Sequence, residues 1–479
     1  MVSRTTVSRT VVIGAGPASL VAAYKLIKNG EEVAVIDPAA DLSRLSAVDC
    51  LSDCFAPDAQ DFSFEIKDIK MLQEEILGRR PVGVPRTCRV FYRYRLFDYP
   101  LSVANTCKHL GPIDTVRAAL SYVHVQSQLR ANVAAENFDD LITERFGRYL
   151  SHIFFKPYAE KVWGMPAHKV PAEWAARSLP ASFVPKAALG EPSGKSFDTA
   201  KLNQLPIGTG AFWEKCQQLI EAAGSTVEMN TRVLQIEHTG RRISHIVVQK
   251  GSAIALNSSD HFISNLPIAE LVARLHPPAP PAVIKAAEDL KYRDLIIVLM
   301  TIERKDLFSD SSIYIHSPEF QVGRIQNYRN WHESTLPASS ETTCLGMEYF
   351  CDQADALAQM TDTALIQLAS QELAGLGLVT EAALIAESTV IRRKRAYPLY
   401  EAGYNHHLAL LQNYLKGFEN LQTVGCNGLH QQGTQADAML TGLLAAKDII
   451  ASNRGLRAAS PEPYVTNEID DFNPSRRLS

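Results

Sequence analysis

The chain opens with two short apolar, β-branched runs at 10–13 and 32–36, separated by a segment with helical spacing. A turn with two glycines joins the first run to this segment, which continues to about Asn29, and Gly30 follows it. Short apolar runs that flank an amphipathic segment are typical of strand, helix and strand in sequence. The first 37 residues therefore predict a βαβ unit.

The turn after the first predicted strand carries the clearest candidate chemistry, GAGPAS at 14–19. Gly14 allows a tight turn, and Gly16 lets the backbone approach a pyrophosphate, which the N–H groups of the helix N-terminus can bind. Ser19 takes the place of the usual third glycine or alanine and is small enough for close helix–strand packing. Asp37 ends the second strand, where an acid can accept hydrogen bonds from a ribose. The pattern indicates a dinucleotide site, with an ordinary βαβ crossover as the alternative.

Later segments predict a larger α/β chain. Residues 62–177 are mostly helical in pattern, with one hairpin at 89–99, and PPAPPA at 277–282 predicts a rigid surface link. Alternation and turn residues predict strands at 226–237, 242–250, 261–265, 295–303, 344–350 and 421–424. Helical spacing predicts helices at 211–223, from Pro267, at 361–376 and at 437–451.

A second glycine turn, GCNG at 425–428, follows the last predicted strand, and a polar loop leads from it to the helix that begins near Asp437. A nicotinamide site is normally completed within one contiguous Rossmann half. A dinucleotide fold that resumes near the end of the chain therefore favours FAD. His430, just after this turn, is the candidate general acid or base.

Composition narrows the class of protein. The 479 residues are 46% hydrophobic and 21% charged, which is typical of a globular protein and excludes a disordered, collagen-like or coiled-coil chain. A net charge of -4 predicts no nucleic-acid partner. The longest apolar run is strand length, and no signal-peptide pattern is present, so we expect no membrane span and a cytoplasmic protein.

Other chemistries find little support. The eight cysteines form no CxxC or zinc-type spacing, which predicts reduced thiols, although Cys50 and Cys54 could share a helix face. His406 and His407 are adjacent and would point apart, so we expect no metal site. The sequence contains no GxSxG motif, which would indicate a hydrolase.

Several longer stretches resemble the FAD-dependent amine oxidase superfamily, in particular the bacterial branch related to protoporphyrinogen oxidase and UDP-galactopyranose mutase. The likeness covers most of residues 9–452. Besides VVIGAGPASLVAAYKL, it rests on RFGRYLSHIFFKPYAEKVWGMPAHKVPAEWAARSL (145–179), LPIGTGAFWEKC, HFISNLPIAELV, GRIQNYRNW, RKRAYPLYEAGY and VGCNGLHQQGTQADAMLTGLLAAKDI.

The resemblance implies an α/β fold with a Rossmann-like, GR2-type FAD-binding domain, a helical insertion and a mixed-sheet substrate domain. We expect the FAD-binding domain to be discontinuous, from 1–70, 205–290 and 385–455. A mainly helical substrate or cap domain would occupy 71–204, a sheet substrate domain 291–384, and a mobile tail 456–479.

The resemblance also implies roles for individual residues. FAD would be bound non-covalently by Gly14, Gly16, Pro17, Ala18, Ser19, Asp37, the backbone near Val233, Gly425, Cys426, Asp437, Met439 and Leu440. Tyr158 and Trp163 would lie on the substrate side. The catalytic candidates are His430, Tyr397, Arg324 and Asn327, and Arg392, Arg393 and Arg395 are further candidates for binding substrate.

Two departures from the family pattern bear on function. Residues 38–62 contain no glycine where the family has a glycine-rich segment, and Cys426 replaces the usual arginine of the late turn. We expect an FAD-dependent oxidoreductase acting on a small metabolite, in secondary-metabolite or sugar-nucleotide biosynthesis. A redox-neutral mutase or isomerase on a sugar nucleotide is one alternative. A flavin-free relative, acting as a non-redox enzyme or binding subunit, is another, and a homo-oligomer is left open.

Overall fold

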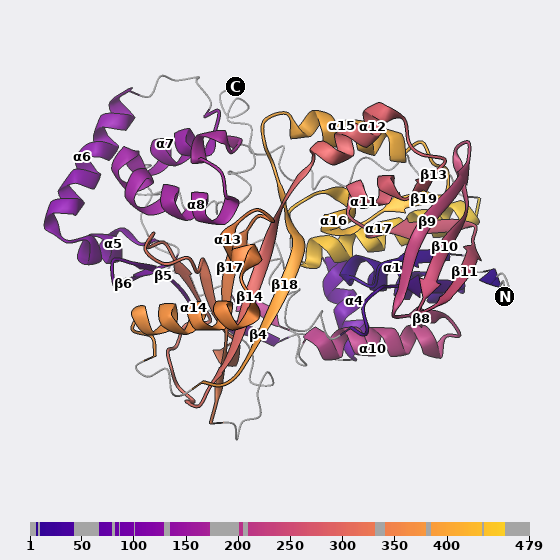
Figure 1. The fold of residues 1–479 in the computed structure, drawn as a ribbon, viewed down its shortest axis with the longest axis horizontal. Helices are drawn as coiled ribbons and strands as arrows, with labels where there is room; N and C mark the ends of the chain where they lie inside the picture. Colours follow the sequence, from indigo (N-terminus) through magenta and orange to yellow (C-terminus); the bar gives the residue numbers. More distant parts are fainter. Residues whose placement is uncertain are drawn as a thin grey trace. The chain divides into compact units, whose positions relative to one another are not determined.

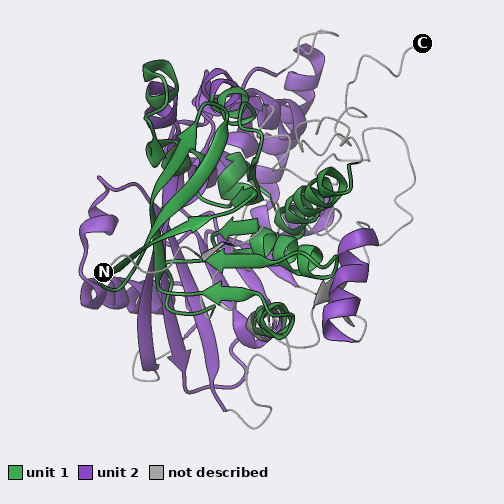
Figure 2. Cartoon of the chain, turned by 90° about the vertical axis from the view of Figure 1, so that its right-hand side faces the viewer, with its two compact units in different colours: residues 1–45, 213–284, 411–479 green, residues 46–212, 285–410 purple. Residues whose placement is uncertain are grey.

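Figure 1 shows the fold as a computed structural model. It describes residues 6–7, 10–42, 67–78, 82–85, 87–99, 101–128, 135–172, 201–204, 209–330, 341–379, 385–433 and 435–455. Cys50, Cys54, the tail at 456–479 and the glycine-free stretch beyond residue 42 lie outside these ranges. The chain forms two compact units, coloured in Figure 2: unit 1 is 1–45, 213–284 and 411–479, and unit 2 is 46–212 and 285–410. The domain boundaries given above stay a prediction.

Unit 1 is built on a parallel five-stranded sheet. Its strand order is β19 (Leu421–Thr423), β12 (His261–Ser264), β2 (Thr10–Ile13), β3 (Val33–Ile36) and β8 (Thr226–Glu228). The strands β2 and β3 are buried throughout, which explains their continuous apolar runs. The strand order reverses between β2 and β12, and ligands of such sheets bind outside the carboxyl ends of the strands at this point.

Two helices of unit 1 meet with their backbones in contact. Helix α1 (Pro17–Ile27) packs on α17 (Gln435–Asn453) at Gly442, where a Cβ atom would lie 2.7 Å from the carbonyl carbon of Ala18. Only glycine allows this approach. A second sheet has the order β1 (Thr6–Val7), β11 (Ala253–Ser258), β10 (Arg242–Lys250), β9 (Thr231–Thr239) and β13 (Leu275–His276). The remaining short helices of the unit are α11 (Ile268–Ala273) and α16 (Gly425–Leu429).

Unit 2 contains a seven-stranded mixed sheet. Its order is β18 (Ile385–Leu399), β14 (Lys291–Ile302), β17 (Thr343–Cys351), β16 (Arg324–Asn327), β15 (Ser312–Ile315), β5 (Cys88–Tyr92) and β6 (Arg95–Asp98). Alternate residues of β14 face opposite sides. Ile296 and Val298 join the cluster of α14 (Asp362–Gly375), whereas Leu295 and Ile297 join the aromatic cluster of α7 (Phe138–Leu150) and α8 (Lys156–Trp163). A small sheet pairs β4 (Val82–Pro85) with β7 (Lys201–Gln204).

The helices of unit 2 lie mainly before β14 in sequence. They are α4 (Lys67–Leu77), α5 (Val103–Leu110), α6 (Pro112–Gln128), α7 (Phe138–Leu150), the π-helical turn η2 (Ser151–Phe155), α8 (Lys156–Trp163), the 3₁₀ turns η3 (Ala167–Lys169) and η6 (Tyr328–Asn330), and α13 (Ala356–Gln359). Three helices continue from one unit into the other: α10 (Thr209–Ala222), α12 (Pro281–Asp289) and α15 (Tyr404–Leu415). None of the helices in the described part of the chain is long and apolar enough to cross a membrane.

The predicted hairpin at 89–99 is confirmed as β5 and β6, and the predicted first strand, helix and second strand as β2, α1 and β3. Two local predictions were wrong. The proline-rich link becomes helical at Pro281, because proline is well suited to the first turn of a helix. The predicted glycine turn at 425–428 forms the short helix α16, which starts at Gly425, instead of a simple turn.

Candidate nucleotide site and a buried polar cluster

The glycine turn after β2 is tied to the end of β3. Gly14 has a φ of +95°, which favours glycine, and its N–H donates to the Ile36 carbonyl at 2.8 Å. The next N–H, of Ala15, donates to Asp37 Oδ2 at 2.6 Å, and Ala39 N–H donates to Oδ1 at 2.8 Å. Each carboxylate oxygen can accept more than one hydrogen bond. Asp37 is thus buried at the carboxyl end of β3, with both carboxylate oxygens accepting backbone N–H groups.

The N-terminus of α1 lies beside this turn. Gly16 is its N-cap in extended conformation, Pro17 is the first helical residue, and no side chain of the described residues caps it. The first N–H groups of a helix have no intrahelical acceptor and attract anions. The Ser19 hydroxyl is fully buried and has no hydrogen-bond partner among the described residues. Ala18 instead faces α17 at Gly442.

The crevice between β2 and β12 contains a residue that the sequence did not single out. Asn265 follows β12, and its side chain lies between the first and the late glycine turns. A Cβ atom on Gly16 would collide with Asn265 Nδ2, and one on Gly425 would lie 3.0 Å from Asn265 Cγ. Both glycines therefore leave room for an amide that can offer a donor at the ligand end of the sheet.

The late turn is anchored to α17. Gly425 has a φ of +75°, and its N–H donates to Thr441 Oγ1 at 2.8 Å. Cys426 and Asp437 both approach Gly433, where a Cβ atom would lie 3.4 Å from Cys426 Sγ and 3.2 Å from Asp437 Oδ2. The remaining predicted residues here are fully buried His430 in a left-handed conformation, buried Met439 and partly buried Leu440.

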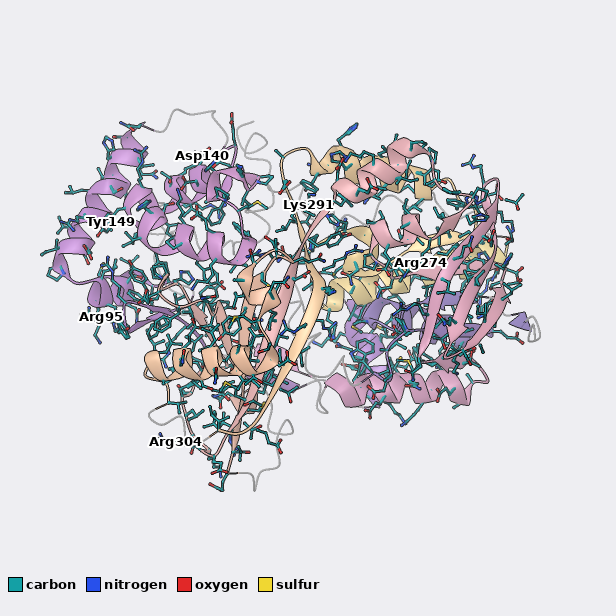
Figure 3. The ribbon with its side chains drawn as sticks, viewed as in Figure 1. Arg95, Asp140, Tyr149, Arg274, Lys291 and Arg304 are labelled. Carbon is teal, nitrogen blue, oxygen red and sulfur yellow. The ribbon has the colours of Figure 1, made fainter. Side chains whose placement is uncertain are left out.

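The backbone near Val233 is already in use within the chain. Val233 is buried in β9, and its carbonyl accepts a hydrogen bond from Arg274 Nε at 2.8 Å. Arg274, labelled in Figure 3, also forms an ion pair with Glu270 at 2.6 Å. The donors and acceptors around β2, β3 and β12 fit a dinucleotide by their chemistry, and the predicted role of the backbone near Val233 stays a prediction.

Unit 2 holds a separate polar cluster, centred on a buried ion pair. Arg324 of β16 and Glu348 of β17 are partners on neighbouring antiparallel strands, with Nε–Oε2 at 2.8 Å and Nη2–Oε1 at 2.9 Å. Burial raises the pKa of Glu348, and the Arg324 charge opposes this rise. The Arg324 guanidinium also lies 5.9 Å from the centre of the Tyr314 ring. The predicted catalytic arginine therefore has a carboxylate partner of its own.

Two predicted tyrosines join this cluster. Tyr158 of α8 stacks on the His316 ring at 4.1 Å, and Tyr397 of β18 is buried beside Phe350. Burial raises the pKa of both phenols, and the Glu348 carboxylate raises it further. Tyr158, Tyr397 and Arg324 thus lie around the Glu348 carboxylate. The two phenols are neutral, and Arg324 is paired with the carboxylate.

His316 and Lys161 extend the cluster toward α8. His316 Nδ1 donates to the Phe154 carbonyl at 2.8 Å, and burial lowers the pKa of His316 to about 3. Lys161 Nζ donates to three carbonyls, of Ile315, Ser317 and Val322, at 2.8–3.2 Å. Burial lowers the pKa of Lys161 to about 8. The imidazole is therefore neutral near neutral pH, and the ammonium holds the chain between β15 and β16.

Most of the other predicted residues of unit 2 have contacts of their own. Trp163 packs edge-on against Phe138 at 4.8 Å in the aromatic core, and Asn327 Nδ2 donates to the Phe308 carbonyl at 3.2 Å. Arg392 pairs with Asp362 at 2.8 Å, and Arg395 lies over the Tyr292 ring at 5.7 Å. Arg393 is on the same strand, β18. Their predicted roles toward substrate stay predictions.

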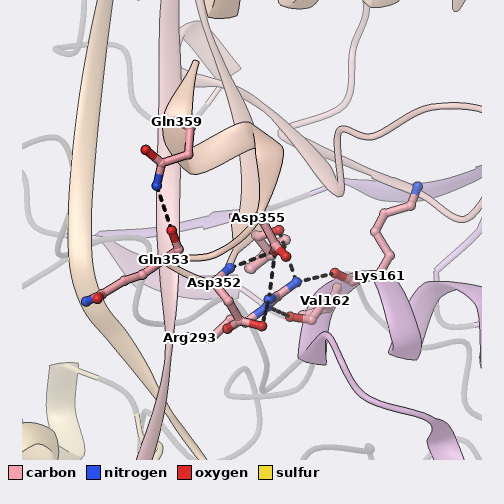
Figure 4. A network of polar contacts seen from close by, with 8 residues as sticks. Lys161, Val162, Arg293, Asp352, Gln353, Asp355 and Gln359 are labelled. Carbon is pink, nitrogen blue, oxygen red and sulfur yellow. Dashed lines mark hydrogen bonds and ion pairs between the residues drawn. The ribbon is translucent and has the colours of Figure 1, made fainter. Parts of the chain in front are cut away.

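Arg293 of β14 is a buried charge of unit 2 with several partners (Figure 4). Its guanidinium contacts Asp352 at 2.5 Å and Asp355 at 3.2 Å, and it donates to the carbonyls of Lys161, Val162 and Phe350 at 3.1–3.4 Å. Gly164, which ends α8 with a φ of +67°, lies against this guanidinium, so a Cβ atom there would collide with it.

Comparison with known proteins identifies the family. Residues 148–450, more than half of the chain, match the family described as flavin containing amine oxidoreductase. The chain belongs to the flavin-containing amine oxidoreductases. A search of curated proteins finds no match to it.

Several solved structures share the fold of this chain. Reduced UDP-galactopyranose mutase matches with a TM-score of 0.69 and 16% identity, over 94% of this chain and 98% of the other. A putative protoporphyrinogen oxidase from Exiguobacterium sp. 255-15 matches with a TM-score of 0.68 and 14% identity, over 94% of this chain and 100% of the other. Cyclohexylamine oxidase from Brevibacterium oxydans IH-35A matches with a TM-score of 0.62 and 14% identity, over 93% of this chain and 99% of the other. The predicted α/β fold and family are confirmed.

Sequence reasoning missed Asn265, Glu348, His316 and Lys161. Two of them leave a signal in the sequence. Asn265 ends a predicted parallel strand, and polar residues at that end face the ligand crevice. Glu348 is the single charge within the apolar strand CLGMEYF, and such a charge requires a partner. His316 and Lys161 leave no comparable signal.

Proposed function

We propose that the chain is an FAD-dependent oxidoreductase that oxidises a small metabolite by hydride transfer. The observation that carries this proposal is the site at the carboxyl ends of β2, β3 and β12. There Gly14, the uncapped N-terminus of α1 and the Asp37 carboxylate lie together at the reversal of strand order. Membership of the flavin-containing amine oxidoreductases supports FAD over other dinucleotides.

Each residue of this site has a distinct proposed task. Asp37 accepts the ribose hydroxyls, and the first N–H groups of α1 and the Asn265 amide bind the pyrophosphate. The Ser19 hydroxyl, buried in the same turn, adds a further donor. When bound, FAD supplies the acceptor for the hydride, and the protein supplies orientation and electrostatics. His430, buried after α16, is the proposed general acid or base.

The first experiment measures flavin directly. We expect the purified protein to show flavin absorbance, or to gain it with FAD in a one-to-one titration, and to release flavin on denaturation. Asp37→Asn should weaken FAD binding, because an amide nitrogen cannot accept a ribose hydroxyl. Asp260→Ala, an exposed acid of unit 1, is the matched control and should bind FAD normally. A folded protein that retains no flavin after incubation with FAD and removal of the unbound cofactor contradicts the proposal and favours the flavin-free alternative.

A redox-neutral mutase is the second candidate, and the likeness to UDP-galactopyranose mutase favours it. The two candidates differ in electron balance. Oxidation consumes oxygen, or another acceptor, in proportion to product. A mutase converts a sugar nucleotide without net electron transfer and needs reduced flavin throughout. Oxygen uptake with small amines or alcohols, compared with sugar-nucleotide conversion by dithionite-reduced protein, separates them.

A further inference from the structure

Helix α6 carries its aliphatic side chains on the side that faces solvent. Ile113, Val116, Leu120 and Val123 are three or four residues apart, so they form one stripe along the helix. Their exposed fractions are between 57% and 68%. A surface helix normally turns such a stripe toward the core, and contiguous exposed apolar surface marks an interaction site.

A different side of α6 already packs on α7. A Cβ atom on Gly147 would lie 2.7 Å from the Tyr122 backbone nitrogen, so the two helix backbones are in contact. Tyr149 N–H donates to Ser121 Oγ at 3.0 Å, and Gln126 Nε2 donates to the Glu144 carbonyl at 2.8 Å. Figure 1 shows α7 beside α6. The aliphatic stripe is therefore not part of the packing between α6 and α7.

Exposed cations lie next to the start of this helix. Arg93 and Arg117 contact Asp114, in the first turn of α6, at 3.1 and 3.4 Å. Arg95, labelled in Figure 3, donates to the His109 carbonyl at the end of α5. Residues 93–128 contain four basic residues and only two acidic ones, in a chain of net charge -4. The region combines apolar surface with local positive charge.

We propose that this α6 surface docks on an anionic lipid bilayer. The surface comprises the aliphatic stripe together with Arg93, Arg95 and Arg117. The aliphatic side chains enter the boundary between headgroups and acyl chains, while the cations meet lipid phosphates. Guanidinium groups bind phosphate oxygens through two parallel hydrogen bonds. The proposal does not depend on flavin or on the reaction.

Charge favours lipid over a second copy of the chain. In a symmetric antiparallel pair, Ile113 would face the partner's Val123 and Val116 the partner's Leu120, which places the two-fold axis near Ala118. Residues near such an axis face their own copies. Arg117 would then lie close to the partner's Arg117, and like charges oppose each other. An anionic bilayer supplies negative charge to all three of these arginines.

Vesicle sedimentation of the full-length protein tests the proposal. We expect binding to vesicles of phosphatidylcholine with phosphatidylglycerol, weaker binding at high salt, and little binding to phosphatidylcholine alone. The double variant Val116→Ser/Leu120→Ser should partition at least about tenfold less, because each side chain loses apolar contact. Arg117→Gln should bind about fivefold less, and only to the anionic vesicles. Ile254→Ser, an exposed aliphatic of β11 in unit 1, is the matched control and should bind like the unchanged protein.

The outcomes separate the occupants. Equal binding by the double variant and the unchanged protein overturns the proposal, provided that circular dichroism shows both folded. If the double variant does not fold, Val123→Ser alone replaces it, and we again expect weaker partitioning into vesicles, by a smaller factor. Light scattering gives the remaining outcome. If the protein does not bind vesicles but forms a dimer that the double variant abolishes, lipid docking is overturned and the stripe is assigned to a second copy.

Discussion

In unit 1 the polar groups at the carboxyl ends of β2 and β12 lie beside glycines, with an uncapped helix and a buried serine hydroxyl that has no described partner. In unit 2 the buried charges of β14, β16 and β17 are surrounded by their own counterparts. Arg324 has Glu348, Arg293 has two aspartates and three carbonyls, and Lys161 has three carbonyls. The two regions bury similar groups in different states.

This difference separates groups available to a ligand from groups that hold the fold. A buried polar group without a partner costs stability, and a ligand can remove that cost. A buried charge with complete pairing gains nothing from a ligand unless the pairing breaks. We therefore infer that the site at β2 and β12 binds a ligand, and that the ion pair of unit 2 mainly stabilises the sheet. Four experiments test this difference between the two units.

The largest effect should come from breaking the buried ion pair. Arg324→Met alone leaves Glu348 buried without its counter-charge, which should lower the free energy of unfolding by about 3–5 kcal/mol. The double variant Arg324→Met/Glu348→Leu should recover most of this loss, because a buried pair can be exchanged for apolar side chains at little cost. Urea denaturation of the two single variants and the double variant gives the coupling. If Arg324 instead serves substrate, Arg324→Met keeps its stability and the double variant recovers nothing.

The Asn265 contact should give the next effect, in unit 1. Gly16→Ala adds a Cβ atom that collides with Asn265 Nδ2, and we expect a loss of about 1–3 kcal/mol. Asn265→Ala should keep the fold, weaken FAD binding and recover most of the loss when combined with Gly16→Ala. Gly442→Ala is the matched control, because its Cβ atom meets the Ala18 backbone, so Asn265→Ala cannot rescue it. Equal losses from Gly16→Ala with and without Asn265 would show that the side chain is not between the turns.

The elements of unit 1 could be predicted because their signals are local. The β-branched run at Thr10–Ile13, Gly14 and Pro17 each fix their own stretch of backbone. The position of Asn265 could not be predicted in this way. It depends on three distant segments, 14–16, 265 and 425, which meet only through the strand order of the parallel sheet.

Unit 2 was less predictable, since its key contacts depend on register and orientation. Arg324 and Glu348 pair because β16 and β17 are aligned at these two residues, and a shift of one residue would separate their side chains. Helix α6 has a periodic aliphatic pattern that predicts a helix correctly. The pattern does not show that the stripe faces solvent, because this depends on where α7 packs.

The pH dependence of unit 2 tests its pairing by a smaller effect. The pKa of His316 is about 3 in the fold against 6.5 in the unfolded chain, so the unfolded state binds a proton that the folded state excludes. The stabilisation is complete above pH 6.5 and is lost as the pH falls toward 3. Between about pH 7.5 and pH 5 the loss should be about 2 kcal/mol. His316→Phe, which keeps a ring against Tyr158, should show a flatter profile in denaturation, whereas the exposed control His406→Gln should match the unchanged protein.

Ser19 should give the smallest effect and the sharpest distinction between fold and ligand. Its buried hydroxyl has no described partner, so Ser19→Ala should raise the stability of the FAD-free protein by about 1 kcal/mol, with a contribution from the helix propensity of alanine. Ser19→Gly removes the same hydroxyl but disfavours the helix, so it should be about 1 kcal/mol less stable than Ser19→Ala. With FAD bound, the gain of Ser19→Ala should disappear if the hydroxyl donates to the pyrophosphate, because the variant then loses a hydrogen bond that the unchanged protein makes. A gain that persists unchanged in thermal melts with saturating FAD would show that Ser19 only fills space beneath Gly14, and that the ligand-facing groups of unit 1 are limited to the α1 N-terminus, Asp37 and Asn265.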